Sequence, residues 1–261
     1  SDNIIKDIVA CPNCGALLKY DYIRYNHIGR AHCPNCDFGS PEMDYSVEKI
    51  DYENQRCLIK LPCGTCDFKL IGSNVTDIYN MTAAIALLSE LGLEVSQIQK
   101  SFEKIKVLES RYYSEKVHGK ELVISLAKGQ NPIACSRICD FIRHETGTKA
   151  VVCMMDDCYD AKESSENIAW IFDIDFEFLN DASVKQIVLT GVRNADYHLR
   201  LLMAGIPEEK IVLCEKEEDA ASYVDYAAVD KIYILHDIYS VQYENAKKVY
   251  QDLKNRLEER G

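Results

Sequence analysis

Two Cys-x-x-Cys pairs, Cys11-Pro-Asn-Cys14 and Cys33-Pro-Asn-Cys36, stand eighteen residues apart near the start of the sequence. Each pair can wrap a tight turn around one side of a metal ion, and two such turns supply four thiolates in tetrahedral array. The segment between them, residues 15–32, is rich in Tyr, Leu and Ile and is expected to form a hairpin. The double spacing therefore predicts a zinc ribbon, with these ligands: Cys11, Cys14, Cys33 and Cys36.

A metal with four protein ligands has no open coordination position. The zinc is therefore expected to hold the local structure and to do no chemistry. The alternative is a pair of redox dithiols. A redox Cys-x-x-Cys normally lies where a strand turns into a helix, and neither pair opens a helical pattern.

The composition is that of a globular protein. The chain has 261 residues, of which 47% are hydrophobic, and this length is enough for two compact domains. The net charge of −12 argues against a protein that covers nucleic-acid phosphates. The sequence contains neither a run of eighteen apolar residues nor a signal-peptide pattern. The 12 cysteines do not follow the spacings of a small secreted scaffold, which indicates a reduced, cytoplasmic setting.

The stretch after the ribbon predicts strands over residues 45–51 and 56–61. A third pair, Cys63-Gly-Thr-Cys66, lies between two short apolar stretches and predicts a hairpin with Gly64 in the turn. Two interpretations of this pair stay open: part of a second metal site, or a turn that merely contains two thiols. Helices are expected over 74–92, closed by Gly92, and over 95–102.

From Leu122 onward, short apolar runs alternate with helical patterns. This alternation predicts a parallel sheet covered on both faces, with ligands bound at the carboxyl ends of the strands. The expected strands are 122–126, 150–155, 187–190, 211–214 and 232–235, and the expected helices are 135–144, 197–204, 218–227 and 241–259.

Three segments together resemble a known family. They are Cys11–Gly29, Asp77–Ala84, and Trp170–Glu177 followed by Ile187–Arg193. The chain is similar to the MurT subunit family of lipid II isoglutaminyl synthase, which has a Mur-ligase fold with a Cys₄ ribbon inserted in its central domain. The resemblance covers nearly the whole sequence, and the ribbon hairpin is its most specific part.

The resemblance implies an α/β protein in three parts. Residues 1–45 would be the zinc ribbon, 46–110 the rest of the Mur-ligase central domain, and 111–261 a Rossmann-like C-terminal domain with a parallel sheet. The family's phosphate loop, of the G-x-x-x-x-G-K-[ST] kind, does not occur in this sequence. We therefore expect the C-terminal part of a longer protein, which alone neither hydrolyses ATP nor transfers phosphate from it.

The resemblance also implies a reaction. A MurT-type subunit uses ATP and Mg²⁺ to activate the α-carboxylate of D-isoglutamate in lipid II, as an acyl phosphate. A GatD-type glutaminase partner hydrolyses glutamine and delivers ammonia, so that the heterodimer is a glutamine-dependent C–N ligase of peptidoglycan synthesis. A carboxylate is a poor electrophile until one of its oxygens becomes a leaving group, which is why the reaction needs ATP. The substrate would be met at the inner membrane face by a protein that does not span the membrane.

Residue by residue, the resemblance points to three positions for nucleotide or substrate binding. Asn80 matches the second Asn of the family's helix motif, in which Asp77 replaces the first Asn. Arg111 matches an Arg at the domain junction. Lys128 matches the Lys of a Leu-Ala-Lys stretch, with Gly129 and Gln130 inserted before the Asn-Pro that follows it in the family.

Asn167 stands where the family has an Asp that completes the partner's glutaminase triad. That Asp orients the partner's His, whose Cys is the nucleophile. An Asn can orient a His through its carbonyl but does not stabilise the imidazolium as a carboxylate does. Three hypotheses follow: Asn167 supports a weaker activity, Glu166 or Asp160 supplies the carboxylate, or the cross-subunit role is lost. Trp170, the only Trp, is expected to be a packing anchor.

Two other functions remain as alternatives. The Asn167 and Asp77 changes leave room for a divergent Mur-fold ligase with another carboxylate substrate. A zinc-ribbon binding module is the other, because Tyr22 and Arg24 are among the hairpin residues able to stack on single-stranded nucleic acid. The acidic charge of the rest of the chain argues against that module.

Overall fold

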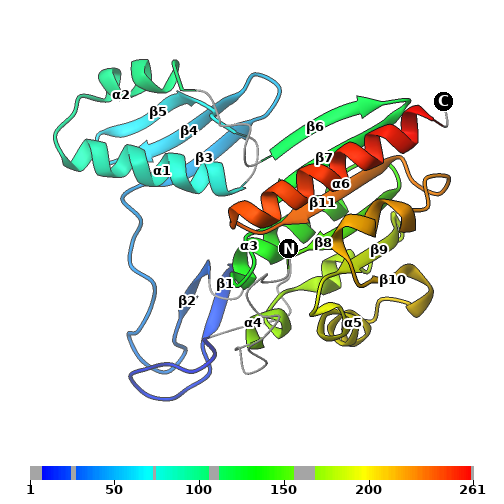
Figure 1. The fold of residues 1–261 in the computed structure, drawn as a ribbon. Coiled ribbons are helices and arrows are strands. Elements are labelled where there is room, and N and C mark those ends of the chain that lie inside the picture. The colour runs from blue at the N-terminus through cyan, green and yellow to red at the C-terminus, as the bar shows by residue number, and fades with distance from the viewer. Residues whose placement is uncertain (1–7, 25–27, 73–74, 106–111, 156–167, 260–261) are drawn as a thin grey trace. The chain divides into compact units, whose positions relative to one another are not determined.

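The computed structural model describes five segments of the chain (Figure 1): residues 8–24, 28–72, 75–105, 112–155 and 168–259. The chain divides into two compact units. One unit is residues 39–108, and the other combines residues 1–38 with residues 109–261. The domain limits expected at residues 45 and 110 stay predictions.

The segment between the first two cysteine pairs forms a hairpin. Strand β1 (Lys19–Arg24) pairs antiparallel with strand β2 (Ile28–His32). The first cysteine pair precedes β1 and the second follows β2. The hairpin therefore brings the two pairs together, and the hairpin expected between them is confirmed.

Residues 39–108 form an antiparallel sheet with helices packed on one face. The elements are β3 (Ser46–Asp51), β4 (Arg56–Leu61), β5 (Gly64–Lys69), α1 (Val75–Glu90) and α2 (Val95–Phe102). Alternate residues of β4, namely Cys57, Ile59 and Leu61, are buried, because alternate side chains of a strand point to the same face. They form one core with residues of the two helices: Ile78, Met81, Ile85, Ile98 and Phe102.

The strands and helices of this unit were predicted closely, but the tip of the β4–β5 hairpin differs from the expectation. Leu61 pairs with Gly64, so that Pro62 and Cys63 make the turn and Gly64 begins β5. Gly64 has φ 127°, a conformation that side chains rarely adopt. The glycine is thus needed directly after the turn and not inside it.

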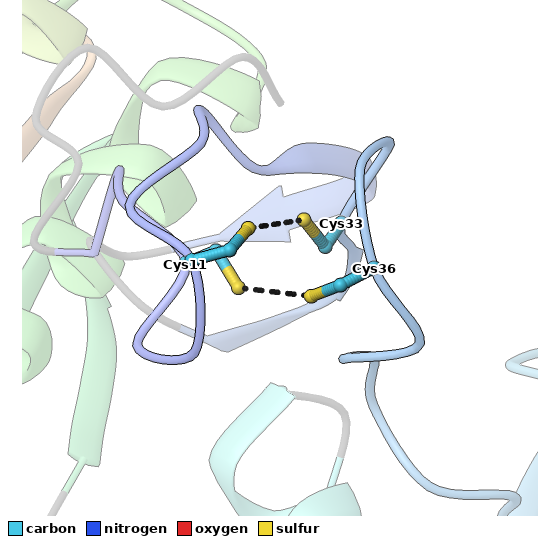
Figure 2. A group of neighbouring side chains, drawn as sticks. Cys11, Cys33 and Cys36 are labelled. Atoms are coloured by element: carbon cyan, nitrogen blue, oxygen red, sulfur yellow. Dashed lines mark hydrogen bonds between the residues drawn. The ribbon is translucent and has the colours of Figure 1, made fainter.

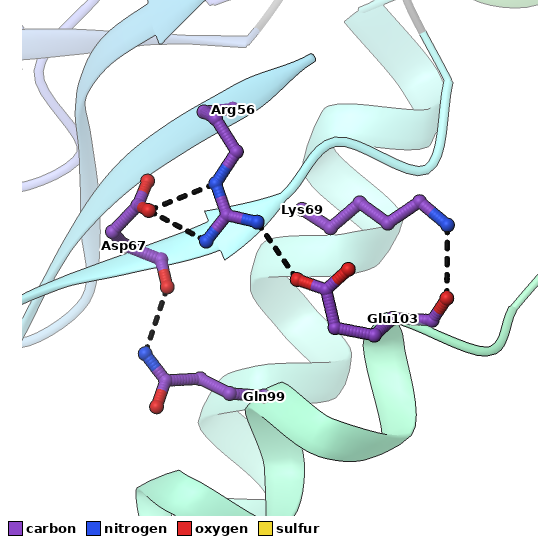
Figure 3. Close-up of polar contacts among 5 residues, drawn as sticks. All are labelled: Arg56, Asp67, Lys69, Gln99 and Glu103. Carbon is purple, nitrogen blue, oxygen red and sulfur yellow. Dashed lines mark hydrogen bonds and ion pairs between the residues drawn. The ribbon is translucent and has the colours of Figure 1, made fainter. Parts of the chain in front are cut away.

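Arg56 joins three elements of this unit (Figure 3). Its Nε and Nη2 donate to Asp67 Oδ2 on β5 at 2.8 and 2.5 Å, and its Nη1 donates to Glu103 Oε1 at the end of α2 at 2.7 Å. Lys69 Nζ donates to the Glu103 carbonyl at 2.9 Å, and Gln99 Nε2 donates to the Asp67 carbonyl at 2.7 Å. These contacts fix the end of α2 against β5.

The C-terminal domain is built on a six-stranded sheet in the order β10-β9-β8-β11-β7-β6. Its strands are β6 (Tyr112–Val117), β7 (Lys120–Leu126), β8 (Lys149–Met154), β9 (Val184–Thr190), β10 (Ile211–Cys214) and β11 (Lys231–His236). Strands β7 to β11 run parallel to one another, as expected. Every residue of β8 is buried, which explains the apolar run from Ala150 to Met154 that follows Lys149.

The sheet is mixed and not purely parallel, because β6 runs antiparallel to β7. The sequence analysis did not predict β6. Its signal was the pair His118-Gly119, whose φ angles of 45° and 79° make the two-residue turn typical of a tight hairpin. Strand β6 lies at the sheet edge and exposes most of its side chains, so it lacks the apolar run that marks the other strands.

Helices cover both faces of this sheet (Figure 1). Helix α6 (Ser240–Glu258) crosses one face and shares a core with the 3-10 helix η5 (Glu217–Tyr223). The other face is covered by α3 (Pro132–His144), α4 (Ala169–Phe172), η3 (Phe176–Leu179) and α5 (Asn194–Met203), and η4 (Glu208–Lys210) precedes β10. None of the described helices is long and apolar enough to cross a membrane.

The helix expected over 218–227 is wrong, because the segment is a 3-10 helix that ends at Tyr223. In an α-helix the Asp225 amide would donate to the Ala221 carbonyl. Instead, the Asp225 amide donates to Gln186 Oε1 at 2.8 Å, and the Tyr226 hydroxyl donates to the Ala221 carbonyl at 2.7 Å. One side chain distant in the sequence, Gln186, and one nearby, Tyr226, thus replace the helical hydrogen bond.

Arg200 is a buried cation that ties α5 to η3. Its side chain is 4% exposed, and its Nη2 donates to Glu177 Oε2 at 2.8 Å and to the Ile174 carbonyl at 2.6 Å. The guanidinium also lies 5.8 Å from the centre of the Phe176 ring. A buried charge with these partners is costly to leave unpaired.

Replacing Arg200 by Ala is expected to lower the free energy of unfolding by about 3 kcal/mol, because Glu177 and the Ile174 carbonyl lose their donor. Urea denaturation followed by circular dichroism measures this loss. The control is Arg256→Ala, which breaks a half-exposed pair with Asp252 on α6 and should cost less than about 1 kcal/mol. Equal losses in the two variants would contradict the assignment.

Candidate functional site

The four ribbon cysteines form one compact group (Figure 2). Cys11 Sγ lies 3.6 Å from Cys36 Sγ, and Cys14 Sγ lies 3.5 Å from Cys33 Sγ. All four sulfur atoms lie within 4.8 Å of one another, and Cys11 and Cys33 are buried. Among the described residues, this is the one group of three or more Cys, His, Asp or Glu side chains close enough to hold a metal ion.

These distances fit a tetrahedral metal site. Zinc–sulfur bonds of about 2.3 Å place the corners of a tetrahedron about 3.8 Å apart. The sulfur atoms of the two close pairs are already near this spacing. Four thiol ligands match zinc by number and softness and leave no position for water or substrate. The group can thus hold a metal ion that stabilises the ribbon.

The backbone around the first cysteine pair is arranged as a knuckle. The Cys11 amide donates to the Ala16 carbonyl at 2.7 Å, and the Gly15 amide donates to the Cys11 carbonyl at 2.9 Å. Gly15 has φ 73°, so glycine relieves the strain of the turn. In the second pair, the Cys33 amide donates to the Phe38 carbonyl at 2.8 Å.

Hydrogen bonds to sulfur favour the thiolate of Cys14. The pKa of Cys14 is lowered to about 6, first by the backbone amide of Ala16 and then by the Cys33 thiol and the Asn35 side chain. The pKa of Cys36 moves the opposite way: the Phe38 amide lowers it, but burial and the neighbouring thiols raise it more. Four thiolates this close can ionise together only beside a cation, because their charges repel.

The second candidate region is the carboxyl edge of the C-terminal sheet. Lys128 follows β7 there, and its side chain is exposed. Lys128 and Gln130 have φ of 61° and 60°, a left-handed conformation that costs about 1 kcal/mol or more for a residue with a side chain. Gly129 between them is buried, and a Cβ at this position would collide with the Asp237 carboxylate and the Met155 carbonyl. The loop is therefore fixed by contacts from Met155 and Asp237, the residues directly after β8 and β11.

The Asn-Pro of this loop begins α3. Asn131 Oδ1 accepts a hydrogen bond from the Ala134 amide at 3.0 Å, and Pro132 is the first helical residue. This is the usual role of Asn as an N-cap and of Pro in the first turn. Gly129 and Gln130 thus separate Lys128 from the start of the helix.

The sequence analysis did not single out His236 and Asp237, which lie at the same edge. Both are buried, with 3% and 1% of their surface exposed. His236 Nδ1 lies 2.7 Å from the Asp237 carbonyl, and the His236 ring packs on Tyr243 at 5.1 Å. Burial lowers the pKa of His236, although the hydrogen bond to Asp237 raises it. A polar pair directly after an apolar strand was the available signal.

The structure describes some of the remaining predicted residues and not others. Asn80 is exposed on α1, one turn after Asp77, and a Cβ at Gly72 would collide with the Asp77 carboxylate. Asp77 lies in the first turn of α1, where a negative charge favours the helix dipole. Arg111 lies outside the described residues, and so do Asn167 and the alternatives Glu166 and Asp160. The binding and catalytic roles of these positions stay predictions.

Trp170 was expected to be a packing anchor, and its ring packs against the core of the C-terminal domain. Its ring meets the ring of the buried Tyr197 edge-on at 6.1 Å, and Tyr197 meets Phe176 in the same way at 6.1 Å. The Tyr197 hydroxyl donates to the Met155 carbonyl at 3.3 Å. These contacts hold α4 against α5.

Comparison with known proteins agrees with this geometry. Residues 128–241 match a family model described as MurT ligase C-terminal. The MurT subunit of lipid II isoglutaminyl synthase (glutamine-hydrolyzing) from Staphylococcus aureus strain COL is 33% identical over 217 residues, which are 83% of this chain and 47% of that protein. The subunit of the same name from Streptococcus pneumoniae is 27% identical over 87% of this chain and 49% of that protein.

The MurT resemblance stated from the sequence is therefore confirmed. The chain spans about half the length of the curated relatives it matches. Solved structures show a Mur ligase-like fold. A pseudomurein peptide ligase type C from Methanothermus fervidus has a TM-score of 0.66 at 20% identity, over 95% of this chain and 49% of that one. A MurF from Acinetobacter baumannii has a TM-score of 0.61 at 14% identity, over 81% and 45%.

Replacing Cys33 by Ser is expected to abolish tight metal binding, because three thiolates and a hydroxyl do not complete the site. The purified chain should carry about one zinc per molecule, and the variant far less. Atomic emission measures the zinc content, and the cobalt-substituted protein should show a thiolate-to-cobalt absorption band. The control is Cys57→Ser, a buried cysteine of β4 that should leave the zinc content unchanged. Equal zinc in all three proteins would refute the site.

The lowered pKa of His236 has a consequence for stability. In the unfolded chain His236 becomes protonated near the usual histidine pKa of about 6.5. In the folded chain its pKa is lower, so His236 stays neutral to a lower pH. Stability is therefore lost as pH falls through about 6.5 towards the folded pKa. His236→Asn keeps a donor near the Asp237 carbonyl and should flatten the dependence between pH 7 and pH 5, measured by urea denaturation. An unchanged slope would contradict the burial of a neutral histidine.

Proposed function

We propose that this chain is part of a MurT-type subunit of a glutamine-dependent amidotransferase. The enzyme would amidate the D-isoglutamate α-carboxylate of lipid II during peptidoglycan synthesis, in the cytoplasm and at the inner membrane face. One observation carries the proposal: the 33% identity over 83% of this chain to a protein named as the MurT subunit of a glutamine-hydrolysing lipid II isoglutaminyl synthase.

The partner in this proposal is a GatD-type glutaminase that supplies ammonia. ATP with Mg²⁺ would supply the phosphoryl group that turns a carboxylate oxygen into a leaving group. Within this chain, the exposed amide of Asn80 and the exposed amine of Lys128 are candidates to bind nucleotide or substrate, as is Arg111. The fixed backbone around Gly129 supports this role for Lys128, because a rigid loop limits the positions that the Lys128 side chain can reach.

In the proposed enzyme, the ribbon has a structural role. Its four thiols leave a bound zinc ion no open position, so zinc would stabilise the ribbon and take no part in the reaction. The segment that carries Asn167 leads into α4, which the Trp170–Tyr197 contact holds on the domain core. An anchored α4 would limit the positions that the preceding residues can adopt at a partner surface.

A second candidate is a Mur-fold ligase that acts on another carboxylate without a glutaminase. The observation that favours it is Asn167, which stands where the resemblance places an Asp. The Mur ligase-like fold is common to both candidates. A test of the partner therefore separates them.

Glutaminase activity of a GatD-type partner, alone and mixed with this chain, tests the proposal. The native chain should stimulate the partner, and Asn167→Asp should raise the rate further, by about tenfold or more, because a carboxylate stabilises the imidazolium. The matched control is Asn255→Asp on the exposed side of α6, which should leave the rate unchanged. If the partner neither binds nor responds to either version, the amidotransferase proposal fails and the other ligase remains.

A further inference from the structure

The cysteines of the described residues differ sharply in exposure. Cys11, Cys14, Cys33 and Cys36 belong to the metal group, and five others are buried: Cys57, Cys135, Cys139, Cys153 and Cys214. Outside the metal group, the remaining two described cysteines are Cys63, which is exposed, and Cys66, which is partly exposed. Cys158 lies outside the described residues. A dissolved reagent thus meets Cys63 and Cys66 before any other described thiol beyond the ribbon.

Both of these cysteines lie at the tip of the β4–β5 hairpin. Cys63 is the second residue of the turn that Leu61 and Gly64 close. Cys66 is two residues further along β5, opposite Ile59, at the rim of the core. The space above Gly64 is open, because a Cβ built there would meet no atom within 4 Å. Apart from the neighbouring residues Cys63 and Thr65, nothing in the described part of the chain therefore crowds the tip from that side.

The two thiols also interact with each other. Burial raises the pKa of the Cys66 thiol, and the charge and hydrogen bonding of the neighbouring Cys63 raise it further. Cys66 Sγ turns back towards the tip, where it lies 3.9 Å from the Gly64 carbonyl. Cys63 is thus the thiol that meets solvent, and Cys66 is a second thiol held within its reach.

A metal site is the alternative for such a pair, and the surroundings do not favour it. Zinc takes four protein ligands in structural sites. Among the described residues, no third Cys, His, Asp or Glu joins Cys63 and Cys66 to make a group of possible ligands. Two thiols without further ligands suit thiol–disulfide chemistry, for which Cys-x-x-Cys is a common spacing. This pair differs from the usual redox setting in that it lies at a hairpin tip and not where a strand turns into a helix, so its exposure and its lack of further ligands among the described residues are what favour this chemistry.

We propose that Cys63 and Cys66 form a thiol–disulfide exchange site that takes low-molecular-weight disulfides. The Cys63 thiolate attacks one sulfur of the disulfide, forms a mixed disulfide and releases the first thiolate. The Cys66 thiolate then attacks the Cys63 sulfur, forms the Cys63–Cys66 bond and releases the second thiolate. The two cysteine thiols lose two protons and two electrons, and the external disulfide is reduced to two thiols.

Mass spectrometry after exposure to glutathione disulfide tests the proposal on the zinc-loaded full chain. Free thiols are alkylated, and the protein is digested with trypsin. The peptide Leu61–Lys69 contains Cys63 and Cys66 and no other cysteine. It should be two hydrogen atoms lighter and carry no alkyl group, and excess reduced glutathione should restore both thiols. In Cys66→Ser, which cannot close the ring, a stable glutathione adduct should collect on Cys63.

Cys57 is a control within the same hairpin. It lies on β4, is 1% exposed, and falls in the separate peptide Cys57–Lys60. It should stay unmodified in the folded chain and react after denaturation, and this shows that each variant is folded.

Three results would overturn the proposal. One is a Leu61–Lys69 peptide that keeps both free thiols while Cys57 stays protected. Another is a lasting glutathione adduct on Cys63 in the native chain. The third is a metal content near two zinc ions per chain that falls to about one in Cys63→Ser, because the pair would then be a metal site.

Discussion

Strand β8 is buried along its whole length, with β9 on one side and β11 on the other. A strand covered on both faces favours apolar side chains, since an unpaired polar group there would lose its hydrogen bonds to water. Lys149, the first residue of β8, is buried as well, and its Nζ donates to Ser183 Oγ at 2.8 Å. Polar residues are therefore confined to the strand ends. The helices that cover the faces, and the loops that connect them, follow from this constraint.

The carboxyl edge of the sheet shows the result most clearly. His236 is the last residue of β11 and Asp237 follows it, and Gly129 approaches the Asp237 carboxylate too closely for any side chain. The loop after β7 then accepts two left-handed residues, Lys128 and Gln130. Backbone strain of this kind persists only where the surroundings fix the chain. The close approach of Gly129 to Asp237, directly after β11, fixes the loop. The backbone of Lys128 is therefore held in place.

Local patterns allowed most of the fold to be predicted, and the misses have physical causes. Apolar runs marked the buried strands, and the double Cys-x-x-Cys spacing brought four thiols together, because both features depend on near neighbours. The helix expected at 218–227 failed because Gln186, distant in the sequence, accepts from the Asp225 amide. Strand β6 was missed because an exposed edge strand lacks an apolar run. Gly129 and Asp237 are far apart in the sequence, so no local sequence pattern could predict their contact.

The chain carries Cys-x-x-Cys pairs in two different settings, and the number of nearby thiols separates their chemistry. In the ribbon, a hairpin folds one pair onto another, and four sulfur atoms within 4.8 Å complete a coordination shell. A bound divalent cation would offset the repulsion of the four thiolates and shield them from oxidants. The pair at the β4–β5 tip has no such partner among the described residues, and Cys63 stays in contact with solvent. The same spacing thus favours a closed metal site in one place and exchangeable thiols in the other.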